Sequence, residues 1–536
     1  MATIHGDLRA KARRSEPNLS LALLLTVALS YAAYFVLRFG GLWSDNDTSV
    51  FSNITTRMLI AGSVLFTGQY VHGYAYPAWL GSLSLLTGLA VPVLSTVVTP
   101  FIGVVFLLFF AYLAYCQWLK TPWMAMIGVL LLFGAPDLLF GVLRGNHEKL
   151  TLLLSLAAFY ALMRGIQSIG NQHIGEYLAW ALVLYLSVFT NATVNDYFAS
   201  TLVAATAVAL AVGTWLMKRS HNEQTVHPAF RRLTLVVAAS WLLILWVMFF
   251  VFTPAGIDFQ LLRNAVTKLL SLFLTFHAGS NPYTLARSQW ANPTIVTLVA
   301  AFRWTISLAS FLIWVTALWQ VVVQKQRFAW SRILLIGLYG AFGLTIAVAI
   351  PMDFTGLAAG TNLEVRNFTF FVLFASPLLV WGMSEGPARN LTRWLGTCRP
   401  LVGMVAPAML VGFIVIGLFK ATLDPIVSNQ WMFYRPSEKQ SVSFFWAHAR
   451  DSSLWTGPDN RVRDIWNTWA TTDPYNNSIV GYAINDRERD WLRSPVVLAN
   501  TVAQGMAIPN YLAQDRVFDA GGSQIYHIRP LTMFQN

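Results

Sequence analysis

Residues 19–37, LSLALLLTVALSYAAYFVL, form an uncharged apolar run that follows Arg9, Lys11, Arg13 and Arg14. Its 19 residues are close to the roughly 20 that a helix needs to cross a bilayer. The run is longer than the core of a signal peptide, and no small-residue cleavage site follows it. We therefore expect a retained first transmembrane helix.

The composition extends this conclusion to most of the chain. Of the 536 residues, 56% are hydrophobic and 11% are charged, and the mean hydropathy is +0.54. Soluble domains contain about 25% charged residues. The excess of hydrophobic residues excludes a cytosolic enzyme, a nucleic-acid-binding protein and a disordered scaffold. We therefore attribute the net charge of +12 to the loops of a membrane protein. The two cysteines, Cys116 and Cys398, exclude a disulfide framework and a cysteine-rich metal site.

The apolar segments predict a polytopic α-helical membrane protein with about eleven transmembrane helices. Residues 77–95 are also apolar, but Gly81, Gly88 and Pro92 interrupt them, so we expect an interfacial or re-entrant segment, with a short twelfth span as the alternative. The predicted spans are 19–38, 100–119, 123–141, 149–163, 177–190, 198–217, 233–253, 294–320, 333–351, 368–383 and 401–419.

The distribution of Lys and Arg predicts the orientation. In this layout, the loops on the side of the N-terminus contain sixteen of these cations, and the longer loops on the opposite side contain seven. Cytoplasmic loops are enriched in Lys and Arg. If 77–95 crossed the membrane, this bias would reverse. We therefore expect an integral protein of a bacterial plasma membrane with a cytoplasmic N-terminus and an extracytoplasmic C-terminal part.

Three regions follow from this layout. Residues 1–18 are a cytoplasmic tail, and 19–420 form the transmembrane domain, whose first outer loop is 39–99. Residues 421–536 contain no spanning segment and form an extracytoplasmic domain. The last region has strand-like runs at 478–482, 495–498 and 524–528 and a helical pattern at 437–449, which together predict a small α/β domain.

Motifs of soluble enzymes are absent from the sequence, which has no GxGxxG, Walker, HExxH or GxSxG pattern. The informative stretch is the start of the first outer loop, where Asp45 and Asp47 precede an amphipathic helix. The apolar face of this helix contains Val50, Phe51, Ile54, Met58 and Leu59. One interpretation of Asp47 is a helix N-cap, a position that favours Asp. The other is a functional carboxylate at the membrane surface.

A resemblance supports the functional interpretation. After Asp47 come Phe51, the run RMLIAG at 57–62, Tyr76-Pro77, Trp79-Leu80 and Leu86-Thr87-Gly88. This order resembles the first third of membrane glycosyltransferases of the GT-C fold that use polyprenyl-phosphate sugars, in the branch of aminoarabinose transferase and protein O-mannosyltransferase. The resemblance covers about residues 19–165 well and 360–383 faintly. It implies a GT-C-like fold in which Asp47 is the catalytic aspartate.

A second match lies at 144–150, RGNHEKL, where the family has an Asp and this chain has Glu148. A polar cap on the start of a helix is the alternative there. The resemblance implies transfer of a sugar from a polyprenyl-phosphate donor to an extracytoplasmic acceptor hydroxyl on a glycan, lipid or protein, with inversion. Asp47 would be the general base. Asp45, Asp47 and Glu148 could hold a divalent cation, and no other cofactor is implied.

Further residues are candidates for binding the substrates. Arg or Lys at the bilayer surface can bind phosphate oxygens, and aromatic side chains can stack on sugars or anchor the protein at the interface. For each cation the alternative is a lipid headgroup contact or a loop ion pair. The candidates are Arg57, Arg144, Lys149, Arg263, Lys268 and Arg366, with His72, Tyr74, Tyr76 and His147.

Two other functions remain open from the sequence. A transporter or flippase of lipid-linked glycans would favour internal repeats and charges at mid-membrane. The sequence has no evident repeat, and within the predicted spans Arg303 and Asp137 are the charges that stand out. A non-catalytic partner in an envelope assembly is the third interpretation.

Overall fold

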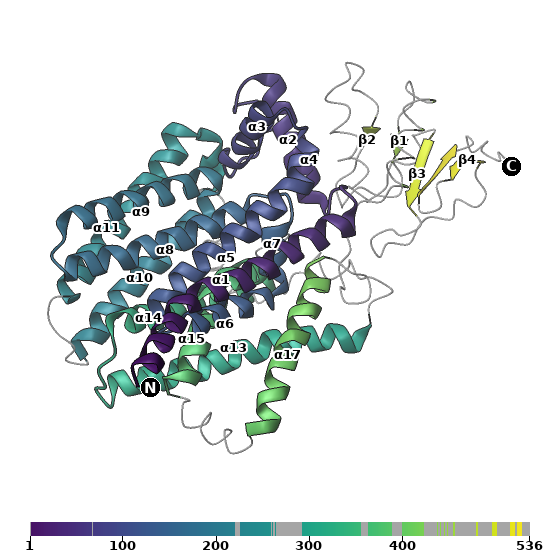
Figure 1. The fold of residues 1–536 in the computed structure, drawn as a ribbon. Helices are drawn as coiled ribbons and strands as arrows, with labels where there is room; N and C mark the ends of the chain where they lie inside the picture. Colours follow the sequence, from purple (N-terminus) through teal and green to yellow (C-terminus); the bar gives the residue numbers. More distant parts are fainter. Residues whose placement is uncertain are drawn as a thin grey trace.

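The computed structural model describes residues 2–219 except Thr67, 226–258, 260, 263, 292–354, 363–387 and 399–422. In the C-terminal region it describes residues 437, 440, 444 and 448 and five strands. The helices form one bundle, and the strands lie beside it (Figure 1). Their bounds are α1 Ala2–Phe39, α2 Asn46–Ala61, α3 Ala75–Thr87, α4 Val91–Val93, η1 Leu94–Val98, α5 Thr99–Trp118, α6 Pro122–Phe133, α7 Pro136–Leu143, α8 Glu148–Gly170, α9 Ile174–Val194, α10 Asp196–Arg219, α11 Val226–Trp246, η2 Val247–Val251, η3 Thr253–Ala255, α13 Pro293–Val322, α14 Trp330–Phe354, α15 Leu363–Ser384 and α17 Arg399–Ala421.

Nine helices in the described ranges are long and apolar enough to cross a membrane, and each overlaps one of the predicted spans. An apolar run of this length satisfies its backbone hydrogen bonds within the helix, which the absence of water in the bilayer requires. These helices are Asn18–Phe39, Val91–Trp118, Glu148–Gly170, Ile174–Val194, Asp196–Arg219, Pro228–Val251, Pro293–Val322, Trp330–Pro351 and Glu364–Ser384. The polytopic helical architecture is thus confirmed.

The predicted span 123–141 was wrong as a single straight helix. Helices α6 and α7 meet at an angle of 82° across Gly134 and Ala135. The cause is Pro136, which disfavours helical backbone at the preceding residue, and Ala135 has φ −96° and ψ 96°. The predicted span 401–419 falls within α17, whose described apolar part is Leu410–Ala421.

The interrupted segment 77–95 is divided between α3 and the start of a membrane-spanning helix that includes α4 and η1. Helix α3 has 13 residues, too few to span a bilayer. It ends at Gly88, which has a left-handed φ of 69° and donates its amide to the carbonyl of Ser84. A new continuous helix then begins at Val91 and runs to Trp118. The second membrane helix therefore starts earlier than the predicted residue 100.

The first outer loop is anchored on one end of the bundle. Phe51 on α2 packs with Tyr76 and Leu80 on α3 and with Val91 and Leu94 at the start of the next helix. Figure 1 shows α2, α3 and α4 together at this end of the bundle. Phe51 and Ile54 of the predicted apolar face are buried, but Ser49, Ser52 and Thr55 are buried as well, so α2 is enclosed on its polar side too.

The core of the bundle is aromatic where α8, α14 and α15 meet. The ring centroid of Phe374 lies 4.8 Å from that of Phe159 and 4.9 Å from that of Phe342. Aromatic contacts of this kind stabilise a core beyond the area that they bury. They pack α8, α14 and α15 against one another.

The C-terminal region contains a five-stranded sheet with the order β2-β1-β3-β5-β4. Its strands are β1 Leu454–Trp455, β2 Ile479–Val480, β3 Val496–Asn500, β4 Asp515–Asp519 and β5 Ser523–His527. Strand β1 pairs in parallel with β2 and β3, and β5 pairs antiparallel with β3 and β4. Strands β2, β3 and β5 overlap the three predicted runs, and the described residues between 437 and 448 are helical.

Candidate active site

Successive membrane helices run in opposite directions, so the chain returns repeatedly to the same end of the bundle. The C-terminal ends of α1, α7 and α9 lie at the end where α2, α8, α10 and α15 begin (Figure 1). Side chains from distant parts of the sequence meet there. The candidate site is built from these helix ends.

Arg144, directly after α7, forms the centre of this region. Its Nη1 lies 3.0 Å from Asp45 Oδ2 and 3.0 Å from Asp47 Oδ2, and its Nη2 lies 2.9 Å from Glu148 Oε2. We call Asp45, Asp47, Glu148 and Arg144 the carboxylate cluster. It joins the two sequence stretches that carried the resemblance.

The loop after Arg144 fits tightly against the start of α2. The amide of Gly145 donates to Thr48 Oγ1 at 3.0 Å. A Cβ atom at Gly145 would lie 2.7 Å from Thr48 Cγ2 and 2.8 Å from the carbonyl oxygen of Ser95. Glycine is therefore required for this close approach, and the approach brings Arg144 to the aspartates.

The N-cap of α2 is Asp45, so the interpretation of Asp47 as the cap of this helix is wrong. Asp45 Oδ1 accepts hydrogen bonds from the amide of Thr48 at 3.3 Å and from the Thr48 hydroxyl. The hydroxyl of Ser44 also donates to Asp45 Oδ1 at 3.0 Å. The Asp45 side chain is 5% exposed, whereas that of Asp47 is 42% exposed. The Asp45 carboxylate therefore has a structural role in capping α2, and the Asp47 carboxylate stays accessible.

The environment of Asp47 favours its neutral form more than water does. Partial loss of water at the helix ends raises the pKa of Asp47, and the negative charges of Asp45 and Glu148 add to this effect. The charges of Arg144 and Arg366 oppose it. An accessible carboxylate with a raised pKa is better suited to accept a proton than an ordinary aspartate.

Two cations near the cluster differ in accessibility. Lys149 is fully buried, and its Nζ has no hydrogen-bond partner among the described residues. This corrects the expectation that Lys149 meets a phosphate at the bilayer surface, because α8 turns it into the protein. Arg366 at the start of α15 is half-buried and interacts electrostatically with Asp47. Its guanidinium makes no ion pair or hydrogen bond with residues in the described part of the chain.

His147 precedes Glu148 and is buried beside two residues that the site predictions left out, Tyr70 and Asn195. The Asn195 amide donates to His147 Nε2 at 3.1 Å, and the Tyr70 hydroxyl lies 3.4 Å from the same nitrogen. Burial lowers the pKa of His147 to about 3, so the imidazole is neutral. His147 is the N-cap residue of α8, yet its side chain makes no capping hydrogen bond. Asn195 could have been suspected from the polar break between the apolar runs 177–190 and 198–217.

The other predicted substrate contacts are dispersed. Tyr76 is fully buried against Phe51 and Trp79, which corrects the expectation that it stacks on a sugar. The Tyr74 ring lies against Phe252, and His72 pairs with Asp258. Arg57 lies beside Gly68, Arg263 is exposed, and Lys268 lies outside the described residues.

In the described structure the Arg144 guanidinium lies between the three carboxylates that the sequence left open as ligands of a divalent cation. A group of a different kind lies nearby. Ligand atoms of His72, Asp196 and Asp258 all lie within 4.8 Å of one another. The sequence predictions did not include either of these two aspartates.

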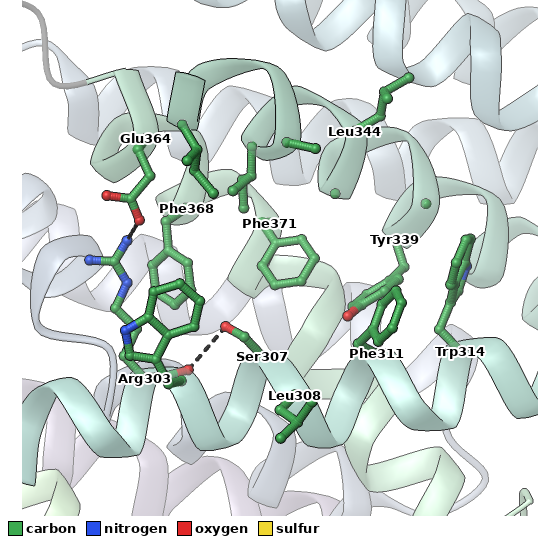
Figure 2. Close-up of a pocket in the computed structure, with 16 residues that line it drawn as sticks. Arg303, Ser307, Leu308, Phe311, Trp314, Tyr339, Leu344, Glu364, Phe368 and Phe371 are labelled. Atoms are coloured by element: carbon green, nitrogen blue, oxygen red, sulfur yellow. Dashed lines mark hydrogen bonds and ion pairs between the residues drawn. The ribbon is translucent and has the colours of Figure 1, made fainter. Parts of the chain in front are cut away.

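An apolar groove runs between α13, α14 and α15, with a volume of about 480 Å³. Figure 2 shows Phe368, Phe371 and Tyr339 along it and Arg303 with Glu364 at one end. Arg303 pairs with Glu364 and lies 3.6 Å from Asp137, so this charge in the eighth predicted span has structural partners. Glu364 precedes Arg366 by two residues, so this end of the groove and Arg366 lie on the same turn of α15.

No known protein-family model and no curated protein sequence matches this chain. Among solved structures, the oligosaccharyltransferase of Archaeoglobus fulgidus in its apo form is similar, with a TM-score of 0.50 and 10% identity over 89% of this chain and 69% of that chain. The same enzyme tethered to an acceptor peptide gives a TM-score of 0.50 and 9% identity over 90% and 69% of the two chains. The chain has the GT-C fold. The structure of ArnT from Cupriavidus metallidurans bound to undecaprenyl phosphate has a TM-score of 0.49 and 12% identity over 94% and 97% of the chains.

Proposed function

We propose that this protein is an integral-membrane glycosyltransferase that moves a sugar from a polyprenyl-phosphate donor to an extracytoplasmic acceptor hydroxyl. Asp47 is the general base in this proposal. The observation that carries it is the difference between the two aspartates. Asp45 caps α2, pairs with Arg144 and is 5% exposed, whereas Asp47 is 42% exposed beside the same arginine.

The chemistry assigns separate tasks to the charged groups. An acceptor hydroxyl becomes a better nucleophile when a carboxylate takes its proton, and Asp47 can do this from its exposed side. Arg144 holds the Asp47 carboxylate in place at 3.0 Å. A phosphate leaving group needs positive charge rather than a proton donor, and Arg366 is a half-buried cation near the cluster that makes no ion pair with the described residues, whereas Lys149 is fully buried. Arginine suits this role because it binds two phosphate oxygens at once.

The groove between α13, α14 and α15 supports a lipid-linked donor. Its apolar walls would accommodate an isoprenoid chain, and its polar end lies at the same turn of α15 as Arg366. A lipid in the groove would thus carry its phosphate toward the carboxylate cluster. One solved structure of the same fold is an oligosaccharyltransferase, which is in line with transfer of a sugar or glycan.

The side of the membrane on which transfer occurs and the stereochemistry of the product follow from this assignment. With a cytoplasmic N-terminus, the C-terminal end of α1 and the cluster beside it lie outside the cytoplasm, where lipid-linked sugars replace nucleotide sugars as donors. The acceptor oxygen loses its proton to the base and bonds to the anomeric carbon as the bond from that carbon to the phosphate oxygen breaks on the opposite face. The polyprenyl phosphate leaves, and this single displacement implies inversion at the anomeric carbon. The cation count of the loops supports the orientation.

The test is an assay of the purified full-length protein with a panel of polyprenyl-phosphate sugars and soluble and lipid acceptors. We expect transfer with at least one donor, loss of transfer with Asp47→Asn, and a product of inverted configuration by NMR. The same protein in vesicles tests the transporter alternative. Translocation of a lipid-linked glycan that Asp47→Asn leaves unchanged, without any transfer, would overturn the proposal.

A further inference from the structure

A second cluster of ligand-type side chains lies beside the candidate active site. His72 comes from the loop between α2 and α3, Asp196 is the first residue of α10, and Asp258 follows η3. Their candidate ligand atoms all lie within 4.8 Å of one another. His72 Nδ1 is 2.6 Å from Asp258 Oδ1 and 2.7 Å from Asp258 Oδ2. Three distant parts of the chain thus converge on one point.

The backbone around His72 is docked rigidly on the junction between α9 and α10. The amide of Tyr74 donates to the Thr193 carbonyl at 2.9 Å, and the amide of Asp196 donates to the His72 carbonyl at 3.2 Å. A Cβ atom at Gly73 would lie 2.4 Å from the carbonyl oxygen of Val194, so this position requires glycine. The relative position of His72 and Asp196 is therefore set by the main chain.

No cationic side chain in the described part of the chain pairs with the carboxylate of Asp196. Asp196 is 1% exposed, and neither of its carboxylate oxygens has a hydrogen-bond partner within the described residues. Asp258 is 8% exposed, and the ring of His72 is its partner. A buried carboxylate without a donor is costly, and a second carboxylate close by increases this cost. A cation bound between the two carboxylates would remove both penalties.

We propose that His72, Asp196 and Asp258 bind a divalent transition-metal ion of the Zn²⁺ type. One imidazole nitrogen and two carboxylate oxygens are ligands that Zn²⁺ uses in proteins. The imidazole disfavours Mg²⁺ and Ca²⁺, which take oxygen ligands, and Zn²⁺ binds such a site more tightly than Mn²⁺. Three protein ligands leave a coordination position for water or another ligand.

The position of this site suggests what the ion does. The ring of Tyr70 lies 5.1 Å from that of His72 and 5.2 Å from that of His147, next to the carboxylate cluster. An ion at His72 would tie the loop that carries Tyr70 to α10 and to the segment after η3. We therefore assign it a positioning role, which holds whether or not the protein transfers sugars.

The test measures binding of Zn²⁺ alone to the purified, chelator-treated full-length protein by titration calorimetry and by elemental analysis after dialysis. We expect one ion per chain and a higher Tm in its presence, since a ligand that binds the folded state stabilises it. His72→Ala, Asp196→Asn and Asp258→Asn should each weaken Zn²⁺ binding by about 10-fold or more. Loss of a residue that only supports a metal ligand already costs about this much affinity, and loss of a ligand should cost at least as much. His173→Ala is the matched control, because His173 is 60% exposed and lies next to Glu176 at the opposite end of α9.

Asp196→Asn keeps the test interpretable because it removes one buried charge while keeping the shape. We expect this variant to fold at least as stably as the metal-free wild type and to have lost the Tm increase with Zn²⁺. Absence of stoichiometric Zn²⁺ in the wild type would overturn the proposal. Equal binding by the wild type and the three ligand variants would overturn it as well.

Discussion

The guanidinium of Arg144 and the carboxylate of Asp47 lie 3.0 Å apart, although one follows α7 and the other lies in the first turn of α2. The same guanidinium also contacts Asp45 and Glu148. Arg144 therefore fixes Asp47 without enclosing it, since 42% of the Asp47 side chain stays exposed. This arrangement leads to predictions that separate structural residues from those acting on substrate.

Replacing Asp47 by Asn should remove the base and leave the fold intact. General-base catalysis contributes about 10²–10⁴-fold, so turnover should fall by roughly that factor. The measurement is turnover with saturating donor alongside thermal unfolding in detergent. Because Asp45 is the N-cap of α2, Asp47→Ala should be nearly as stable as Asp47→Asn. A stable and fully active Asp47→Asn protein would end the assignment.

Replacing Asp45 by Ala should act mainly on stability. The change removes the cap of α2, which costs about 0.5–2 kcal/mol, and leaves buried Arg144 with one anion fewer. Breaking a buried ion pair costs about 3–5 kcal/mol, so the Tm should fall well below that of Asp47→Ala. Asp45→Asn retains the cap, so its Tm should lie between those of Asp45→Ala and Asp47→Ala. Equal Tm values for the two alanine variants would contradict this prediction.

Replacing Arg366 by Ala should weaken binding of the lipid donor. A hydrogen bond to a charged group contributes about 1.5–3 kcal/mol, so the apparent KM for donor should rise about 10-fold or more. Lys120→Ala is the control, because Lys120 is a 67% exposed cation paired with Glu385 away from the cluster. Unchanged donor kinetics in Arg366→Ala would show that this arginine contacts only bulk lipid.

The pH dependence of kcat/KM should report Asp47. A general base works when it is deprotonated, so activity should fall as the pH decreases through the pKa of Asp47. Because this pKa is raised, the acidic limb should lie above the usual value of about 3.9. His147 stays neutral with a pKa of about 3 and should add no limb near its ordinary pKa of about 6.5. The residual activity of Asp47→Asn should lack the acidic limb; persistence of that limb would assign it to another group.

Tyr76 provides a test of a core residue that the sequence suggested as a substrate contact. Tyr76→Phe should leave stability and kinetics nearly unchanged, because the hydroxyl has no hydrogen-bond partner in the described structure. Tyr76→Ala should lower the free energy of unfolding by about 3–5 kcal/mol, as for other large aromatic residues in cores. Thermal unfolding and the donor KM distinguish the two roles. A stable Tyr76→Ala protein with a raised KM would restore the sugar-stacking role.

The sequence by itself determined the properties that depend on local composition. Apolar runs of about 20 residues form helices wherever a bilayer replaces water, so nine predicted spans coincide with helices of the structure. The positions of Asp47, Glu148 and Arg366 beside such spans were equally visible. The bend at Ala135 was overlooked although Pro136 signals it, because hydropathy does not measure backbone geometry.

The tertiary structure decided which of these side chains act together. Whether Asp45 or Asp47 caps α2 depends on one turn of backbone, and Arg144 reaches both because Gly145 lets its loop approach Thr48. The burial of Lys149 and Tyr76, and the meeting of His72 with Asp196 and Asp258, depend on how helices rotate and pack. A hydrophobic pattern fixes that a helix forms, but the direction in which each polar side chain points is set by contacts between segments far apart in the chain.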